Sequence, residues 1–95
     1  MPHRRSLIWY LLAGSRGGES RARIVKAIME RPYNANQLAE TLKLDYKTVR
    51  HHLEVLIDNR IIVVTMRKKY GSVYVLSEEM ERTCGEFKEI WDKLG

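Results

Sequence analysis

The sequence predicts a mainly α-helical domain that carries one small β-hairpin. Three stretches between residues 19 and 59 place apolar residues at helical spacing, and they are separated by Pro32 and by a turn at residues 43–44. Residues 61–66 and 72–76 are rich in β-branched side chains and flank a turn, as hairpin strands do. A chain of 95 residues with 44% hydrophobic content can build one modest core without metals or disulfides. We expect an N-terminal apolar segment and glycine-rich loop at 1–18, a three-helix core with hairpin at 19–76, and a C-terminal helix at 77–95.

The second and third of these helices form a closely spaced pair. Asn34 and Gln37 have the spacing of a capping box, which starts a short helix that ends near Leu42. After a tight turn, Asp45 can cap a longer helix that ends at Asn59. This spacing predicts a helix-turn-helix.

The outer side of the third helix is basic and rich in hydrogen-bond donors. Val49, Leu53, Leu56 and Ile57 are expected to face the core, so helical spacing turns the other side outward. Arg50 can present two parallel donors to a guanine edge, as a helix in the major groove of duplex DNA requires. The residues expected to contact DNA here are Tyr46, Lys47, Thr48, Arg50 and His51.

The hairpin turn supplies a second group of cations. Three successive basic residues can straddle a phosphate backbone or enter a minor groove, although such charge can also simply keep an exposed strand edge soluble. Together with the preceding helices, the hairpin completes a winged helix-turn-helix, in which Asn34 and Gln37 at a helix start are further candidates for contacting the DNA backbone. The wing residues expected to contact DNA are Arg67, Lys68, Lys69 and Tyr70.

The charge distribution separates two parts of the chain. The protein has 17 Lys and Arg against 12 Asp and Glu, a formal net charge of +5, which suits a polyanionic partner. Residues 77–95 run against this trend, with three basic and six acidic residues. We therefore expect this last segment to face away from nucleic acid.

The C-terminal segment predicts a single amphipathic helix that Ser77 caps. Its apolar residues step by four, three, four and three, which is the heptad pattern of a helix that packs on another helix. The narrow stripe favours a homodimer over docking on the chain's own core, and Trp9 offers a second contact for a partner. The seam comprises Met80, Cys84, Phe87, Trp91 and Leu94.

Residues 31–56 and the run from Tyr70 to Tyr74 resemble the ArsR-like winged helix-turn-helix regulators, particularly archaeal ones. The resemblance covers residues 20–76, and residues 48–53 look like the family's recognition-helix core. It implies a dimeric transcriptional regulator that binds an operator with two half-sites, with residues 45–59 in the major groove. Lys43 departs from the pattern, because a glycine often stands at this turn and lysine adopts the left-handed conformation less readily.

Metal sensing is not expected. Several ArsR-like proteins sense metals through a cysteine motif on the recognition helix, and this sequence has no cysteine there. His51 and His52 are adjacent and so point to different faces of a helix, and we expect His51 to face DNA or solvent while His52 packs near the core edge. We expect no metal and no cofactor, and the sequence identifies no small-molecule effector.

Other classes of protein fit the sequence less well. No phosphate-cradling glycine loop or catalytic set is present, so an enzyme is not expected. Arg4-Arg5 and the apolar run 7–13 imitate a secretory signal, but the run is far too short to span a membrane, and a cytoplasmic protein is expected. A protein-interaction module and a non-specific or RNA-binding protein remain the alternatives.

Overall fold

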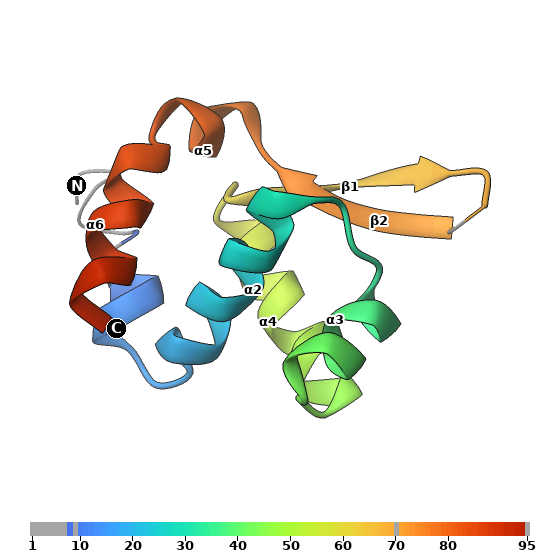
Figure 1. The fold of residues 1–95 in the computed structure, drawn as a ribbon, viewed down its shortest axis with the longest axis horizontal. Helices are drawn as coiled ribbons and strands as arrows, with labels where there is room; N and C mark the ends of the chain where they lie inside the picture. Colours follow the sequence, from blue (N-terminus) through green and yellow to red (C-terminus); the bar gives the residue numbers. More distant parts are fainter. Residues whose placement is uncertain (1–7, 9, 70, 95) are drawn as a thin grey trace.

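The structure, a computed structural model, describes residues 8, 10–69 and 71–94, with the backbone alone at 84, 86, 87, 90 and 94. A short π-helical segment, η1 (Tyr10–Gly14), precedes a three-helix core, which is followed by a hairpin that projects from it and by two C-terminal helices at the opposite end (Figure 1). The predicted winged helix-turn-helix is confirmed. The elements are α2 (Gly18–Glu30), α3 (Ala35–Leu42), α4 (Tyr46–Asp58), β1 (Ile62–Arg67), β2 (Gly71–Leu76), α5 (Glu78–Arg82) and α6 (Cys84–Leu94).

The helix-turn-helix follows the predicted caps. The Asn34 side chain accepts a hydrogen bond from the Gln37 amide at 2.8 Å, and Gln37 Oε1 accepts one from the Asn34 amide at 2.9 Å. These reciprocal bonds satisfy two amides at the start of α3. Asp45 likewise accepts from the Thr48 amide at the start of α4. Between the helices, Lys43 adopts the left-handed conformation, with φ 57° and ψ 45°.

The core confirms most of the predicted inward residues of α4. Val49, Leu53 and Leu56 are buried in the hydrophobic core together with residues of α2 and α3. The expectation for Ile57 is wrong, because its side chain is 36% exposed. The fourth buried residue of α4 is His52, which lies one turn after Val49 on the inward side.

The hairpin is held to the core along its second strand. Val64 pairs with Tyr74 and Thr65 with Val73, so Tyr74 and Val73 lie on opposite faces of the hairpin. The Tyr74 amide donates to the Tyr33 carbonyl at 2.8 Å, which adds a one-residue bridge to the free edge of β2. Tyr74 faces the core, and its side chain is 5% exposed.

The expected single C-terminal helix is wrong. The chain breaks at Thr83, which has φ −110° and ψ 20° and separates α5 from α6. Met80 is fully buried in the chain's own core, so it cannot reach a second subunit as the seam prediction required. Trp91 also packs against this core.

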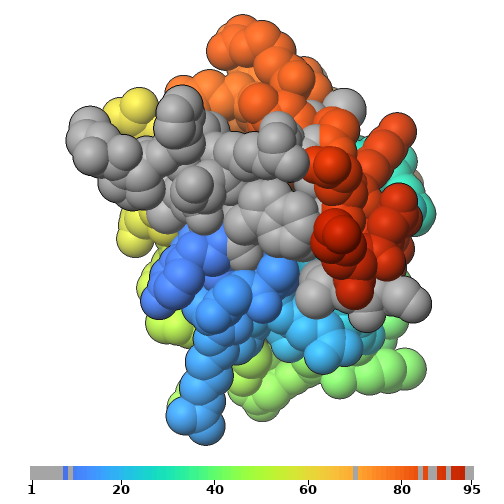
Figure 2. Space-filling model, turned by 90° about the vertical axis from the view of Figure 1, so that its left-hand side faces the viewer, coloured from blue at the N-terminus to red at the C-terminus, as the bar shows by residue number. Residues whose placement is uncertain are grey.

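The N-terminal segment belongs to the same core. Ile8, Leu11 and Leu12 are buried, and η1 packs against α2 and α6. A Cβ atom at Gly18 would lie 2.9 Å from the Leu12 carbonyl carbon, so this close approach requires glycine. Figure 2 shows the described part of the N-terminal segment (blue) and the C-terminal helices (orange to red) on one face of the molecule. Trp9 lies outside the described residues.

Neither a membrane-spanning helix nor a metal cluster is found within the described ranges. No helix there is both long enough and apolar enough to cross a bilayer. Likewise, no three His, Cys, Asp or Glu side chains of residues 8, 10–69 and 71–94 lie together as metal ligands would.

The conformation of Lys43 generates a stability prediction. Replacing Lys43 by glycine should raise the free energy of unfolding by about 0.5–1 kcal/mol, because glycine adopts the left-handed conformation without the Cβ clash. The matched control is Glu40→Gly, an exposed change within α3 that should lower it by about 1 kcal/mol. Urea denaturation measures both values. A loss of stability in both variants would contradict the assigned turn geometry.

Candidate nucleic-acid interface

The predicted reading residues share the exposed side of α4. Tyr46 is 46% exposed, and the other four are exposed as well, while the intervening Val49 is fully buried. The structure therefore gathers all five predicted residues on one helical surface. They are Tyr46, Lys47, Thr48, Arg50 and His51.

A polar hollow of about 210 Å³ lies beside this surface, where the starts of α3 and α4 meet β2. Asn34 was predicted to contact the DNA backbone, and Tyr46 and Arg50 were predicted to read DNA. The other members were not predicted, because they come from the start of α3 and from alternate positions of β2. The polar hollow is lined by Asn34, Ala35, Asn36, Tyr46, Arg50, Ser72 and Tyr74.

Tyr74 holds the most important of these side chains. Arg50 Nη1 donates to the Tyr74 hydroxyl at 3.0 Å. Since Tyr74 is buried and its amide is bonded to Tyr33, the hydroxyl is a fixed acceptor. The guanidinium of Arg50 thus has a defined position at the rim of the polar hollow, with further donors available.

Two of the three predicted wing cations lie in the hairpin turn, and the third lies in a strand. Lys68 and Lys69 occupy the turn, and both are exposed. Arg67 is instead the last residue of β1, and its pairing with Gly71 puts it on the hairpin face opposite Tyr74. Gln37 lines a different hollow, together with Arg67. Tyr70 lies outside the described residues.

A buried arginine ties the N-terminal segment to α4. Arg21 is 5% exposed, and its Nε donates to the Leu11 carbonyl at 2.8 Å. Its Nη2 donates to the Ser15 hydroxyl and the Arg16 carbonyl, and Nη1 lies 3.3 Å from Nδ1 of His52. Burial lowers the pKa of Arg21. Arg21 therefore links η1 and the following loop to the helix that carries the reading residues.

His52 faces the interior, directly behind the exposed His51. Because Arg21 is a donor, Nδ1 of His52 accepts, which requires a neutral ring. Burial, then the positive charge of Arg21 and then that of His51 lower the pKa of His52. The predicted division is confirmed, with His51 exposed and His52 packed inside.

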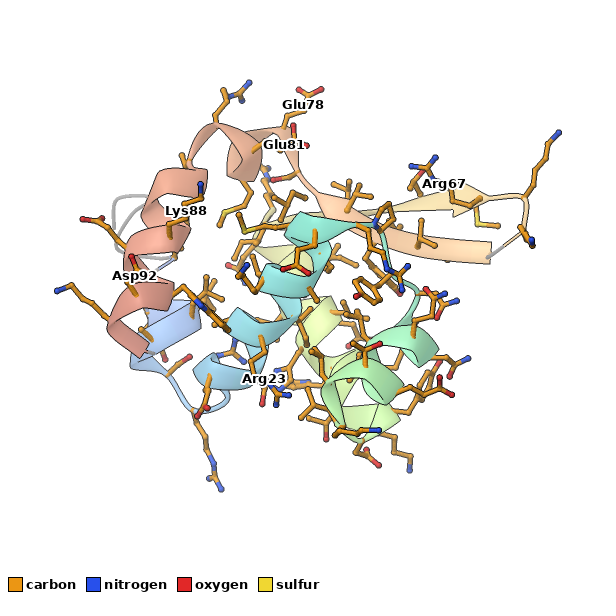
Figure 3. The ribbon with its side chains drawn as sticks, in the orientation of Figure 1. Arg23, Arg67, Glu78, Glu81, Lys88 and Asp92 are labelled. Atoms are coloured by element: carbon orange, nitrogen blue, oxygen red, sulfur yellow. The ribbon has the colours of Figure 1, made fainter. Side chains whose placement is uncertain are left out.

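A second arginine fixes the position of α3. Arg23 Nη2 donates to the Leu42 carbonyl at 2.6 Å, which places a positive charge at the C-terminal end of α3 (Figure 3). A cation there complements the helix dipole. α2 therefore holds both helices of the pair through side-chain contacts, α3 through Arg23 and α4 through Arg21.

Comparison with known proteins identifies the class. Residues 18–63 match the bacterial regulatory protein family arsR. A comparison with curated proteins finds no significant match. The chain is thus similar to the ArsR-family winged helix-turn-helix proteins, and this similarity supports a DNA-binding transcriptional regulator.

Solved structures of other regulators share the fold. The transcriptional regulator BldR from Sulfolobus solfataricus is similar over 95% of this chain and 65% of its own, with a TM-score of 0.74 and 14% identity. The reduced form of the regulator YodB from B. subtilis is similar over 97% of this chain and 90% of its own, with a TM-score of 0.74 and 20% identity. This chain thus spans slightly less than two thirds of the length of BldR.

The buried histidine predicts a pH dependence of folding. Because the folded state lowers the pKa of His52 below its ordinary value of about 6.5, the unfolded chain binds the proton more readily. The stabilisation is therefore complete above about pH 6.5 and is lost as the pH falls toward the folded-state pKa. Urea denaturation between pH 7.5 and 5 should show this loss.

Two variants assign the effect. His52→Gln should flatten the pH dependence in this window, whereas His51→Gln should keep most of it, since His51 is exposed and is the smallest of the three contributions. A loss of stability that survives in His52→Gln would show that another group is responsible.

Proposed function

We propose that this regulator recognises a specific duplex sequence with the N-terminal half of α4 in the major groove. The observation that carries the proposal is the exposed face of α4, where Lys47, Arg50 and His51 stand beside the polar hollow. Arg50 has the geometry to give two parallel hydrogen bonds to a guanine. Tyr46 and Thr48 offer contacts to a phosphate or a thymine methyl group.

The polar hollow suits a DNA phosphate. Besides Arg50, which is proposed to read a base, its lining combines the start of α3 with the Ser72 hydroxyl. The positive end of a helix dipole and charge-assisted donors both favour a phosphate oxygen. In this arrangement the backbone of one strand lies between α3 and the wing, which brings the adjacent base edges to α4.

The wing provides the second attachment. Lys68 and Lys69 project at the turn, where they would contact the flanking backbone or minor groove. Such contacts add affinity and salt dependence without carrying sequence information.

The charge distribution favours DNA over a protein partner. Glu78 and Glu81 lie on α5 and Asp92 on α6, all away from the turn of the wing (Figure 3). A pure interaction domain would not need cations gathered on α4 and the wing while acidic side chains are set apart on α5 and α6. RNA binding usually relies on several exposed aromatic side chains beside the basic surface, and the single tyrosine on the exposed side of α4, Tyr46, does not favour it. The proposed role is regulatory and not enzymatic, and a protein that acts on DNA is proposed to work in the cytoplasm.

We also propose that two chains pair through the face that carries the N-terminal segment and α6. The support is the heptad spacing of Cys84, Phe87 and Leu94 on a helix that lies at the opposite end from the wing. Met80 is no longer part of this surface. A symmetric pair would present two recognition helices to two half-sites.

Two substitutions test the division of labour between helix and wing. Arg50→Ala should lose about 1–3 kcal/mol of the preference for the operator over random DNA, because it removes a base contact. Lys68→Ala should weaken binding to both DNAs almost equally and reduce the salt dependence. Fluorescence anisotropy at two salt concentrations measures all four affinities. Equal effects of both variants on preference would contradict the assignment of α4 as the reading helix.

A further pair of variants tests the dimer. Phe87→Asp with Leu94→Asp should give a monomer in sedimentation velocity and should weaken operator binding, because charge in an apolar seam opposes pairing. The control is Lys88→Asp, at an exposed position of the same helix. If the double variant folds, by circular dichroism, and stays dimeric, the interface lies elsewhere.

A further inference from the structure

A second hollow, here called the wing hollow, opens on the other side of the hairpin. Its volume is about 440 Å³, which falls within the range of small-ligand sites. It brings together the end of α2, the link to α3, α3 itself and both strands of the wing. The wing hollow is lined by Arg31, Pro32, Gln37, Arg67 and Val73.

The wing hollow is separate from the proposed DNA surface. Side chains of paired residues in an antiparallel hairpin share a face, and successive residues alternate. Arg67 and Val73 therefore lie on one face, and Ser72 and Tyr74 of the polar hollow lie on the other. An occupant of the wing hollow would not compete for the polar hollow.

The polar groups of the wing hollow are hydrogen-bond donors. Arg31 is held in place, with its guanidinium carbon 3.9 Å from the centre of the Tyr33 ring and Nη1 donating to the Pro32 carbonyl at 3.1 Å. The guanidinium of Arg67 has no hydrogen-bond or ion-pair partner, and neither arginine side chain has an acidic partner, among residues 8, 10–69 and 71–94. Gln37 already uses its oxygen in the capping box, so it offers its NH₂ group.

The remaining lining is apolar. Pro32 and the nearly buried Val73 contribute only carbon surface. Two guanidinium groups without an acidic partner favour an anion, and the carbon surface favours a ligand with an apolar body. We propose that the wing hollow binds a small organic anion, a carboxylate or a phosphate monoester attached to an aromatic or branched apolar group.

Contacts connect this site to the recognition helix. Arg31 stacks on Tyr33, the Tyr33 carbonyl accepts from the Tyr74 amide at 2.8 Å, and the Tyr74 hydroxyl accepts from Arg50 at 3.0 Å. A ligand that binds both Arg31 and Arg67 would shift the position of the wing through Arg67. Through Arg31 and the contacts of Tyr33 and Tyr74, it would also shift the position of Arg50. The ligand is thus an effector of DNA binding, and this second part of the proposal rests on the proposed function.

The binding site is tested on the protein alone. Titrations with benzoate and phenyl phosphate, followed by nuclear magnetic resonance, should shift the amide signals of Gln37 and Val73. The stronger of the two probes identifies the anionic group. Inorganic phosphate and benzyl alcohol should each bind about tenfold or more weakly, because one lacks the apolar body and the other the charge.

Charge-neutralising variants locate the site. Arg67→Gln and the double variant Arg31→Gln with Arg67→Gln should weaken binding of the stronger probe by about tenfold or more. Lys88→Gln with Lys93→Gln removes two charges from α6, away from the wing, and should leave it unchanged. If the double variant unfolds, probe binding by Arg67→Gln alone decides the test, because Arg67 is exposed at the end of β1. Unchanged binding in Arg67→Gln, or equal binding of benzyl alcohol, would overturn the site.

The effector role is tested with DNA. A saturating probe should change the affinity for the selected operator by about threefold or more, and Tyr74→Phe should keep probe binding while it reduces this change. Probe binding without any change in DNA affinity would overturn the effector role and leave the site standing. Failure to bind any DNA without probe would contradict the proposed function, while the titration on the protein alone still decides the site.

Discussion

Tyr74 joins the wing to the rest of the protein through both its backbone and its side chain. Its amide bonds to the link between α2 and α3, its ring is buried in the core, and its hydroxyl accepts from Arg50. The hairpin alone would be a marginal two-stranded unit. Because one residue fixes both the wing and the reading arginine, the spacing between the two attachments to DNA is set by the fold and not by a flexible loop.

A buried cation performs the matching task on the other side of α4. Burying a charge is costly unless hydrogen bonds compensate it, and Arg21 has two carbonyls, a hydroxyl and an imidazole nitrogen around it. Three of these partners come from residues 11–16, so the N-terminal segment completes the shell of the arginine. Residues 11–16 therefore help to hold the recognition helix in place through Arg21.

Most of the fold could be predicted from local sequence. The caps at Asn34 and Asp45 and the apolar periodicity of α4 act within one or two turns, so the pattern alone marks these boundaries. The break at Thr83 could not be predicted, because the apolar spacing of residues 80–94 continues across it without interruption. The candidate site likewise has a part that local sequence predicts and a part that depends on long-range contacts. The exposed face of α4 follows from helical spacing, whereas Tyr74 and the wing hollow depend on strand pairing between distant residues.

The central claim is that α4 reads a defined base sequence. Selection of bound duplexes from a random pool, carried out in parallel with the unchanged protein and with Arg50→Ala, tests it most directly. The account predicts a palindromic consensus with half-sites about one helical turn apart, and the variant should lose a conserved guanine in each half-site. An unenriched pool, or the same consensus from both proteins, would contradict it.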